Sequence, residues 1–482
     1  MTLYELFQGV SDTAALQDAE ISAVTCDSRL VEKGSLFFCV PGVRFDGHDY
    51  AEKALAKGAV AVVTQRDLGL SGQIVVSDSR EAYSIAAANF YGNPAKKLKL
   101  IGITGTNGKT TITYLIKQIL ESAGKSAGLI GTIHNEIGDM VIPAKHTTPD
   151  PMQLHAMLAR MAEAGCEYVV MEVSSHALDQ KRVFGLQFEC AVFTNLTQDH
   201  LDYHNDMESY YNAKKQLFSM CGTAVINIDD KYGKRLKSET SCKTLTFSCE
   251  TANADFSANN IKFSVNGSRF VVLSESGLSK VDFCMPGKFS VSNALAAVVA
   301  CTSAGIPYDT VLSGLSGCRG VAGRVEILKT DTDFTVIRDY AHSPDGLLNI
   351  LETVREFAPK RVVTLFGCAG NRDRTKRPKM AEIAARLSDF CILTSDNPRD
   401  EPPQRIIDDA MPGLLEHHTP HTAIVDRYDA IAWALDFCEP DDVLVLAGKG
   451  HEDYQVLQHG TIFFDEKVVV AELLNKKRQG KD

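Results

Sequence analysis

The sequence predicts an α/β protein of three domains: a small N-terminal α/β domain at 1–93, a central domain at 94–317 with a mostly parallel sheet, and a C-terminal Rossmann-like α/β domain at 318–482. Three observations predict this organisation. A length of 482 residues suits about three domains. Apolar strand-like runs alternate with helical segments, which is typical of parallel sheets. A glycine-rich turn, GITGTNGKTT at 102–111, stands between a strand-like run and a helix-like run.

The composition is that of an ordinary globular chain, with 44% apolar and 23% charged residues. A net charge of −11 argues against a general surface for nucleic acid or membranes. The 13 cysteines form no CxxC pair, which favours a reduced cytoplasmic protein over disulfides or zinc. The first residues, MTLYELFQGV, lack the pattern of a signal peptide, and no apolar run approaches the ~18 residues of a membrane span. We therefore expect a cytoplasmic chain without membrane insertion.

The N-terminal domain is predicted from strand-like runs at 35–40, 59–64 and 73–78, with a helix at 51–57 between the first two. Polar groups gather at 27–29 and in the turn at 42–47. These features alone indicate no particular chemistry. The tripeptide GNP at 92–94, followed by two lysines, predicts a linker to the next domain.

The central domain begins with a strand at 98–104, the glycine-rich turn, and a helix that Gly124 is placed to end. Further strands are predicted at 168–173, 190–195 and 222–227, with helical stretches between them. A hairpin follows at 261–274 with an Asn-Gly turn at 266–267, and an apolar helix at 291–304 closes the domain. The helix after the turn carries apolar residues at helical spacing: Leu115, Ile116, Ile119 and Leu120.

The glycine-rich turn has the layout of a P-loop-type phosphate-binding loop. In such a loop, backbone N–H groups close around an anion at the positive end of the following helix. Lys109 can neutralise the outer phosphates, and the Thr110 hydroxyl can hold Mg²⁺. The match is not strict, because Ile103 stands where the general motif has a glycine. The alternative is an ordinary glycine-rich turn, which the flanking strand and helix disfavour.

Two groups of possible metal ligands follow neighbouring strands of this domain. Glu172 ends the strand at 168–173, and the segment DHLDYH at 199–204 follows the next one. A single such residue would more often be structural, but two groups on one rim favour a Mg²⁺ site. Lys214 lies in a predicted helix at 211–218, and by residue type alone it is an ordinary lysine on a solvated face.

The C-terminal domain is predicted from strands at 335–341, 361–367, 390–396, 423–427 and 442–448, without a GxGxxG fingerprint. Four polar segments stand at strand ends: DYAHSPD at 339–345, GCAGNRDRTKRP at 367–378, DNPR at 396–399 and GKGHE at 448–452. Open α/β sheets bind ligands at these ends. Any one segment could be a capped loop, but the four together predict a face that binds anions and zwitterions.

Ten ordered motifs resemble those of the Mur ligase family: GTNGKTT, MEVSSHALDQKRV, TNLTQDHLDYH, AKKQLF, GKFSVSNALAA, GRVE, DYAHSPD, NRDRTKRP, DNPR and GKGHEDYQ. The resemblance covers nearly the whole chain. It implies one domain for a UDP-sugar, one for ATP and one for an amino acid. It also implies an ATP-dependent ligase of peptidoglycan precursor synthesis, which adds meso-diaminopimelate to UDP-N-acetylmuramoyl-L-alanyl-D-glutamate through an acyl phosphate.

The resemblance implies a role for each matched position. ATP would be held by Gly105, Thr106, Asn107, Gly108, Lys109, Thr110, Thr111, Asn293, Arg324 and Asp339. Mg²⁺ would be held by Thr110, Glu172 and His200, with Lys214 as a carbamate. The UDP-muramoyl-dipeptide would be held by Ser28, Val43, Arg44, Phe45, His146, Thr147, Thr148, Ser174, Gln180 and Arg182. The amino acid would be held by Arg372, Asp396, Asn397, Pro398, Arg399, Gly448 and Glu452. The implied catalytic residues are Lys109, Lys214, His200 and Asp339.

The choice of amino acid depends on two side chains. Diaminopimelate carries a carboxylate and an ammonium at its far end, whereas L-lysine carries only the ammonium. Arg399 can bind that carboxylate in bidentate fashion and Glu452 can bind the ammonium, which favours diaminopimelate. The alternative for Arg399 is a solvated loop residue that caps the next helix. Three alternative functions stay open: the same ligase adding L-lysine, a folylpolyglutamate synthetase-like ligase, and a P-loop nucleotide switch that forms no bond.

Some positions differ from the usual family pattern. His146 replaces the Asn that usually precedes Thr-Thr-Pro, which affects a substrate hydrogen bond. Ser290 replaces the first Asn of an FNxxN run, which affects a contact near the adenine. Ala369 and Asn371 interrupt the usual GCGGDRD. No phosphate or metal ligand is lost. The implied partners are small molecules, with no nucleic acid, and we expect a monomer.

Overall fold

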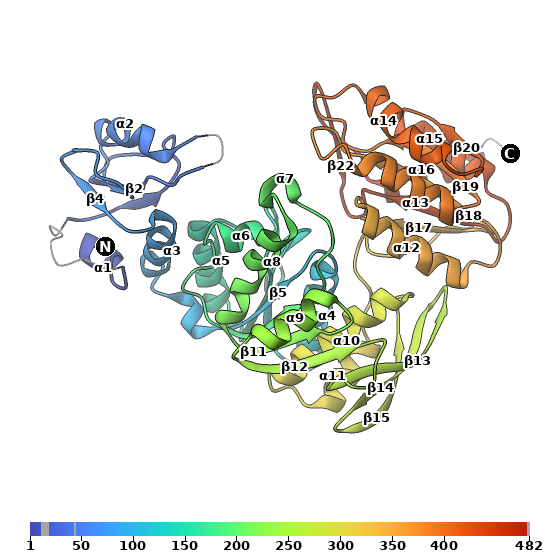
Figure 1. Cartoon of the computed structure of the whole chain (residues 1–482), viewed down its shortest axis with the longest axis horizontal. Helices are drawn as coiled ribbons and strands as arrows, with labels where there is room; N and C mark the ends of the chain where they lie inside the picture. The colour runs from blue at the N-terminus through green and yellow to red at the C-terminus, as the bar shows by residue number, and fades with distance from the viewer. Residues whose placement is uncertain (11–18, 43–44, 480–482) are drawn as a thin grey trace.

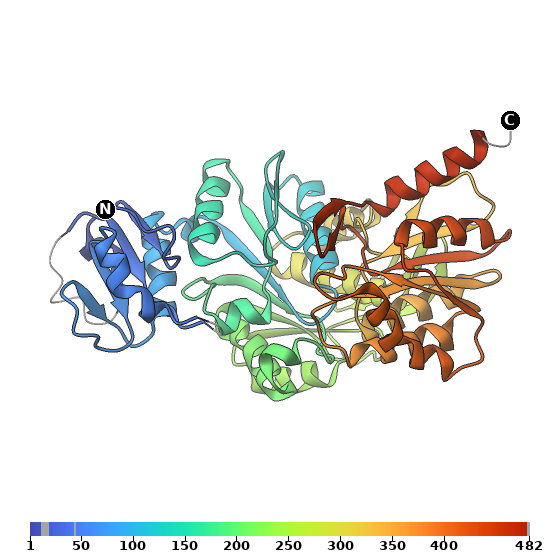
Figure 2. The same cartoon turned by 90° about the horizontal axis from the view of Figure 1, so that it is seen from above.

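The computed structural model describes residues 1–10, 19–42 and 45–479. The chain forms three α/β units in a row, with the N-terminal and C-terminal units at opposite ends and the central unit between them (Figures 1 and 2). Each unit has its own main sheet. The α/β class and the three-unit organisation are confirmed, whereas the boundary residues 93/94 and 317/318 stay a prediction. No helix in the described ranges is both long and apolar enough to cross a bilayer.

The N-terminal unit is a small parallel sheet with helices beside it. Its strands run in the order β1–β2–β3–β4: β1 (Ala23–Thr25), β2 (Ser35–Phe38), β3 (Ala61–Thr64) and β4 (Gln73–Val75). Its helices are α1 (Leu3–Leu6), α2 (Ala51–Ala56) and α3 (Ser79–Phe90). All three predicted strands and the predicted helix α2 are present. The three-residue β1 was not predicted, because so short a segment shows no periodicity.

The central unit has an eleven-stranded sheet in the order β15–β14–β13–β12–β11–β10–β5–β9–β6–β7–β8. The strands from β13 to β6 are parallel, and antiparallel hairpins extend both edges. Its strands are β5 (Lys99–Thr104), β6 (Ala127–Ile130), β7 (His134–Ile137), β8 (Met140–Pro143), β9 (Tyr168–Glu172), β10 (Phe188–Phe193), β11 (Cys221–Asn227), β12 (Lys243–Ser248), β13 (Phe256–Ser264), β14 (Gly267–Ser274) and β15 (Gly277–Phe283). The mostly parallel sheet is therefore confirmed.

Helices cover this sheet and extend its core toward the C-terminal unit. They are α4 (Lys109–Ser122), α5 (Pro151–Glu163), α6 (Ser175–Asp179), α7 (Leu201–His204), α8 (Met207–Lys215), α9 (Lys231–Glu239), α10 (Lys288–Ser303) and α11 (Tyr308–Ser316). Leu115 of α4 and Val298 of α10 are fully buried in one hydrophobic cluster, which also contains Leu347 of the C-terminal unit. The central and C-terminal units therefore share apolar packing.

The predicted hairpin exists, but its turn is displaced by one residue. Ser264 pairs with Gly267, so Val265 and Asn266 form the two-residue loop and Gly267 begins β14. Gly267 has φ 135°, and a Cβ there would lie 2.1 Å from the carbonyl oxygen of Phe283. The close approach of β15 thus requires glycine inside the strand rather than in the loop.

The C-terminal unit has a six-stranded sheet in the order β16–β17–β21–β18–β19–β20, parallel except for β16. Its strands are β16 (Glu326–Leu328), β17 (Thr335–Asp339), β18 (Val362–Cys368), β19 (Phe390–Ser395), β20 (His421–Ala423) and β21 (Val443–Ala447), with a separate hairpin of β22 (Tyr454–Leu457) and β23 (Gly460–Phe463). Its helices are α12 (Pro344–Phe357), α13 (Lys376–Leu387), α14 (Pro403–Leu415), α15 (Arg427–Phe437) and α16 (Glu466–Gln479). The strand predicted at 423–427 lies earlier, because Asp426 caps α15.

Candidate active site

The glycine-rich turn joins β5 to α4 as predicted. Gly105 and Gly108 have φ of 143° and 88°, which side-chain-bearing residues rarely adopt. A Cβ at Gly105 would lie 1.8 Å from the Thr194 hydroxyl, and one at Gly108 would lie 2.5 Å from the Asn293 side-chain oxygen. Both glycines are therefore required by close approaches, and the turn places the first N–H groups of α4 toward the space above the sheet.

Lys109 folds back over this turn. Its ammonium donates to the carbonyl oxygens of Gly105 at 2.9 Å and Thr106 at 2.7 Å. Burial lowers the pKa of Lys109, while the nearby carboxylate of Glu172 opposes that shift. A partly desolvated cation at a helix N-terminus is suited to bind phosphate oxygens.

Glu172 is fully buried at the end of β9 and faces the same turn. Its carboxylate accepts from the Thr110 hydroxyl at 3.1 Å and from the Thr132 backbone N–H and hydroxyl at 2.8 and 3.0 Å. The Arg324 guanidinium donates to the same Thr110 hydroxyl at 3.2 Å. A carboxylate and a hydroxyl on one rim are hard oxygen donors, which fit Mg²⁺.

Lys214 lies on α8 and reaches the turn from the other side. It is 1% exposed, and its ammonium donates to the Gly105 carbonyl oxygen at 2.7 Å and lies 4.6 Å from the centre of the Tyr210 ring. Burial, together with the Lys109 ammonium, lowers the pKa of Lys214 well below that of an ordinary lysine. The interpretation from residue type, a lysine on a solvated face, is wrong, because α8 packs this face against the loop.

The segment 199–204 does not join Glu172 in one ligand cluster. Asp199 forms an ion pair with Lys376 of the C-terminal unit, and His204 Nε2 lies 2.9 Å from the Ser175 hydroxyl. Desolvation at the pocket wall lowers the pKa of His200 to about 4, although Asp199 opposes the shift. Among the described residues, no three His, Cys, Asp or Glu side chains are grouped to hold a metal ion. A metal site formed by Glu172 therefore needs donors of other types, such as the Thr110 hydroxyl.

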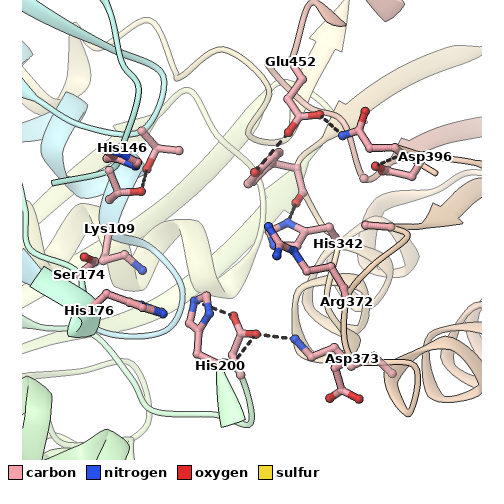
Figure 3. A pocket seen from close by; sticks show the side chains of 18 of the residues that line it. Lys109, His146, Ser174, His176, His200, His342, Arg372, Asp373, Asp396 and Glu452 are labelled. Carbon is pink, nitrogen blue, oxygen red and sulfur yellow. Dashed lines mark hydrogen bonds and ion pairs between the residues drawn. The ribbon is translucent and has the colours of Figure 1, made fainter. Parts of the chain in front are cut away.

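A pocket of about 620 Å³ lies between the central and C-terminal units. Figure 3 shows side chains entering it from both sides. From the central unit come Lys109, His146, Ser174, His176 and His200, and from the C-terminal unit come His342, Arg372, Asp373, Asp396 and Glu452. The structure also places the following residues with implied roles on its wall: Thr147, Thr148, Arg182, Lys214, Asn397, Arg399 and Gly448.

Arg182 organises the central-unit wall of this pocket. Its guanidinium donates to the Thr148 carbonyl oxygen at 2.7 Å and to the Gln180 side-chain oxygen at 2.6 Å. The Thr148 hydroxyl donates to the Glu172 carbonyl oxygen at 2.8 Å. Gln180 does not line the pocket; its side-chain oxygen instead holds the Arg182 guanidinium by a hydrogen bond. His146 is exposed and lines the pocket.

At the far end of the pocket, Glu452 is held by four polar side chains. Asn397 and Lys449 donate to one of its oxygens at 2.9 and 3.0 Å, and the hydroxyls of Tyr340 and Tyr454 lie 3.5 and 3.4 Å from the other. Lys449 is fully buried. Glu452 is thus a fixed carboxylate that points at the pocket.

Asp396 and Arg399 stand close to Glu452. Asp396 is 4% exposed, and one of its carboxylate oxygens has no hydrogen-bond partner among the described residues. The Arg399 guanidinium donates to the Gly370 carbonyl oxygen at 2.7 Å and lines the pocket, so the solvated-cap interpretation is wrong. Pro398 is absent from the lining, but its carbonyl oxygen packs against Gly370. This end therefore offers the Arg399 guanidinium and two carboxylates, of which Glu452 is already paired with Lys449.

A second cavity of about 100 Å³ adjoins the glycine-rich turn. It brings together six residues with implied nucleotide roles: Asn107, Gly108, Thr111, Asn293, Arg324 and Asp339. Burial raises the pKa of Asp339, whose carboxylate accepts from the Val325 N–H at 2.7 Å. Ser290 is fully buried and its hydroxyl has no partner among the described residues; Phe289, beside it in the chain, lines the cavity.

The predicted uridine-side residues lie apart from both cavities. The Lys57 ammonium donates to the backbone carbonyl oxygen of Ser28 at 2.8 Å, and Phe45 is 71% exposed. Neither lines either cavity. Val43, Arg44 and the side chain of Asp202 lie outside the described part of the chain.

Several residues of the site were not found from the sequence. Thr132 binds the Glu172 carboxylate, and Tyr210 and Tyr454 line the pocket. Thr132 and Tyr210 stand in no pattern with chemical meaning, and Tyr454 was noted only as a member of the motif GKGHEDYQ. Lys376 and Lys449 were noted only as members of motifs, and their roles appear only through partners distant in the chain.

Comparison with known proteins gives three domain matches in one order. The sequence models are described as "Mur ligase family, catalytic domain" (residues 20–97), "Mur ligase middle domain" (103–301) and "Mur ligase, glutamate ligase domain" (323–450). A Clostridium tetani protein is 45% identical over 469 residues, covering 95% of this chain and 96% of its own. A Caldanaerobacter subterraneus protein is 46% identical over 480 residues, covering 98% and 99%. Both are named UDP-N-acetylmuramoyl-L-alanyl-D-glutamate--2,6-diaminopimelate ligase.

Solved structures show the same similarity over the whole chain. One described as a UDP-N-acetylmuramoyl-L-alanyl-D-glutamate--2,6-diaminopimelate ligase has a TM-score of 0.72 and 32% identity, covering 99% of each chain. A MurF ligase from Thermotoga maritima, solved in complex with ADP, has a TM-score of 0.62 and 19% identity, covering 95% and 98%. The second shows a common fold alone.

Proposed function

Because the chain belongs to the Mur ligase family, we propose that it is an ATP-dependent ligase that joins meso-diaminopimelate to UDP-N-acetylmuramoyl-L-alanyl-D-glutamate. One observation carries the proposal: a single pocket holds the phosphate-loop Lys109 at one end and the Arg399–Glu452 pair at the other. A phosphate donor and a zwitterion can therefore meet within it. Relatives that are 43–46% identical over nearly the full chain carry this activity in their names.

The first chemical step is attack of the dipeptide's terminal carboxylate on the γ-phosphorus of ATP. This step brings two anions together, so it needs cations at the phosphate end of the pocket. Lys109 and the N–H groups of α4 bind the phosphates, and Arg324 and Asp339 line the adjoining nucleotide cavity. Arg182, on the neighbouring wall, binds the muramoyl substrate. The products of the step are ADP and an acyl phosphate.

In the second step, the α-amine of the amino acid attacks the acyl carbon and inorganic phosphate leaves. Arg399 binds the distal carboxylate and Glu452 the distal ammonium, which fixes the α-amine at the other end of the molecule.

Thr110, Glu172, His200 and a carbamylated Lys214 would hold Mg²⁺, which supplies positive charge to the transferring phosphoryl group when bound. As part of the same proposal, the protein works as a cytoplasmic monomer.

Amino-acid competition tests the proposal. The purified protein is given ATP, Mg²⁺, UDP-N-acetylmuramoyl-L-alanyl-D-glutamate and equal meso-diaminopimelate and L-lysine, and the products are resolved by mass spectrometry. We expect the diaminopimelate product to dominate. Preferential addition of L-lysine would overturn the assignment of Arg399 and Glu452. ATP hydrolysis that needs neither muramoyl substrate nor amino acid would indicate a nucleotide switch, and turnover with a folate acceptor would indicate a folylpolyglutamate-type ligase.

An isotope experiment tests the acyl phosphate separately. If the dipeptide carboxylate attacks phosphorus, one of its oxygens leaves with the phosphate. Substrate labelled with ¹⁸O in that carboxylate should therefore yield labelled inorganic phosphate. Unlabelled phosphate would contradict the mechanism while leaving the choice of amino acid open.

A further inference from the structure

Arg427 and Glu466 form an ion pair in which both side chains are completely buried beneath the amino-acid end of the pocket. Arg427 is the first residue of α15, and Glu466 is the first residue of α16. The Glu466 carboxylate oxygen Oε1 accepts from Arg427 Nε at 2.9 Å and from Nη2 at 2.7 Å. Neither residue lines the pocket. Neither was singled out from the sequence.

The Arg427 guanidinium also links the ends of two strands. Nη1 donates to the Ser395 carbonyl oxygen at 3.1 Å, and Nη2 donates to the Ala447 carbonyl oxygen at 2.8 Å. Ser395 is the last residue of β19 and Ala447 the last residue of β21. These strands are not neighbours, because β18 lies between them in the sheet. The ladder hydrogen bonds therefore do not fix the spacing of their ends directly, and Arg427 does.

The residues that follow these two ends form the predicted amino-acid site. Asp396, Asn397 and Arg399 come after β19, and Gly448 and Glu452 come after β21. The two segments approach so closely that a Cβ at Gly448 would lie 2.7 Å from the Asp396 carboxylate. Asn397 and Glu452 are then joined by a 2.9 Å hydrogen bond. A change in the spacing of the strand ends would therefore alter the distances between these two segments.

Stability alone is a weak reason to bury such a pair. Removing two charges from water costs about as much as their attraction returns, and apolar replacements are often neutral or stabilising. Arg427 also stands at a helix N-terminus, where a cation is unfavourable. The guanidinium is the side chain that can donate in a rigid plane to three acceptors at once, whereas an ammonium cannot span them. The arrangement of the three hydrogen-bond acceptors therefore explains the presence of an arginine here better than the stability gained from the ion pair does.

We propose that Arg427, oriented by Glu466, is a positioning residue that sets the spacing between the 396–399 and 448–452 segments and thereby the affinity for the amino-acid substrate. The inference rests on the proposed function. The inference goes beyond the proposed function, because Arg427 does not line the pocket and acts through two backbone carbonyl oxygens. We expect its effect to be largest for the amino acid, since the phosphate loop and Arg182 belong to the central unit, although Asp339 of the nucleotide cavity lies beside Ala447.

Steady-state kinetics of Arg427→Lys tests the inference. The variant keeps the positive charge but loses the planar fork. We expect the KM for meso-diaminopimelate to rise by about 10-fold or more, since misplacement by about 1 Å can cost that much, while the KM values for ATP and the muramoyl substrate stay within about twofold. Discrimination against L-lysine should fall as well, because the distal carboxylate and ammonium would no longer be matched.

A control ion pair lies at the opposite end of the strands of the same sheet. Arg361 pairs with the fully buried Asp442 beside the first residues of β18 and β21, away from the pocket. Arg361→Lys should lower Tm and change none of the three KM values. If Arg427→Lys lowers Tm but leaves the ratio of KM values unchanged, or raises all three equally, the pair is merely structural and the inference is overturned.

A milder variant covers the case in which Arg427→Lys does not fold. Glu466→Gln keeps Arg427 and an acceptor oxygen but removes the opposite charge that orients the guanidinium. A rise in KM that is selective for the amino acid supports the inference, and unchanged KM values overturn it. The wild-type protein is assayed first. If it adds no amino acid, the proposed function fails, whereas an active wild type with insensitive variants rejects only the role of Arg427.

Discussion

The ammonium of Lys214 donates a hydrogen bond to the carbonyl oxygen of Gly105 at 2.7 Å, although the two residues are 109 positions apart in the chain. The contact places a buried lysine against the phosphate loop and beside Lys109. Burial lowers the pKa of Lys214, and repulsion by the Lys109 ammonium lowers it further. A lowered pKa increases the neutral fraction of a lysine, and the neutral amine is the form that reacts with CO₂ to give an anionic carbamate and a proton.

Lys214→Ala should therefore remove most ligase activity, because the carbamate oxygens would be lost from the Mg²⁺ site. Short carboxylic acids such as acetate should restore part of the activity by occupying the vacated volume. Turnover is measured with and without acetate. Lys215→Ala is the control, since that neighbour forms a surface pair with Glu239 and should keep wild-type activity. Full activity of Lys214→Ala without acetate would contradict the carbamate role.

Lys109 and Thr110 should contribute differently to the use of ATP. Lys109→Ala removes a cation from the phosphates and should reduce kcat at least 100-fold, a loss of about 3 kcal/mol in transition-state stabilisation. Thr110→Ala should chiefly raise the Mg²⁺ concentration needed for half-maximal rate. Circular dichroism should be unchanged in both variants. Lys125→Ala serves as the control, because this exposed lysine beyond α4 pairs with Glu167. A Lys109→Ala variant with wild-type kcat would show that the loop does not bind phosphate.

Arg399→Ala should weaken binding of diaminopimelate without affecting ATP. The Arg399 guanidinium can pair with a distal carboxylate in bidentate fashion, a contact of roughly 1.5–3 kcal/mol. The KM for meso-diaminopimelate should rise by about 10-fold or more, and the KM for ATP should change by less than about twofold. Arg374→Ala is a suitable control, since its guanidinium pairs with Asp409 at the surface. Equal changes in both constants would point to a general disturbance of the C-terminal unit.

His155 on α5 should make stability depend on pH. It is 1% exposed, and neither ring nitrogen has a hydrogen-bond partner among the described residues. Burial lowers its pKa from 6.5 to about 4. Between these values the unfolded chain binds a proton that the folded protein does not bind, so stability is full above pH 6.5 and falls as the pH approaches 4.

The loss attributable to His155 is at most roughly 3 kcal/mol across that window. His155→Leu cannot titrate, so its unfolding free energy should decline less steeply than that of the wild type between pH 7 and pH 4.5. Urea unfolding at both pH values measures the difference. Parallel pH profiles for the two proteins would mean that His155 is protonated without cost in the folded state.

Local sequence predicted the phosphate loop because its glycines, Lys109 and Thr110 lie within ten consecutive residues. The positive φ values of Gly105 and Gly108, the strand before them and the helix after them are properties of a continuous segment. Most strands of the three sheets were predicted for the same reason. Local patterns did not show on which side of the turn Gly267 lies. It belongs to β14, because β15 lies too close at this position for a side chain.

The sequence by itself determined the α/β class, the three-unit organisation, the phosphate loop and, through the order of its motifs, the family. The tertiary structure alone decided the surroundings of individual charges. Lys214 and Lys215 are the same residue type in one helix, yet one is buried against Gly105 and the other forms a surface pair. Arg427 likewise acquires its role from Ser395, Ala447 and Glu466, which only the fold brings together. The reason is physical: desolvation and hydrogen bonding depend on which groups surround a side chain, and contacts between distant segments leave no local pattern in the sequence.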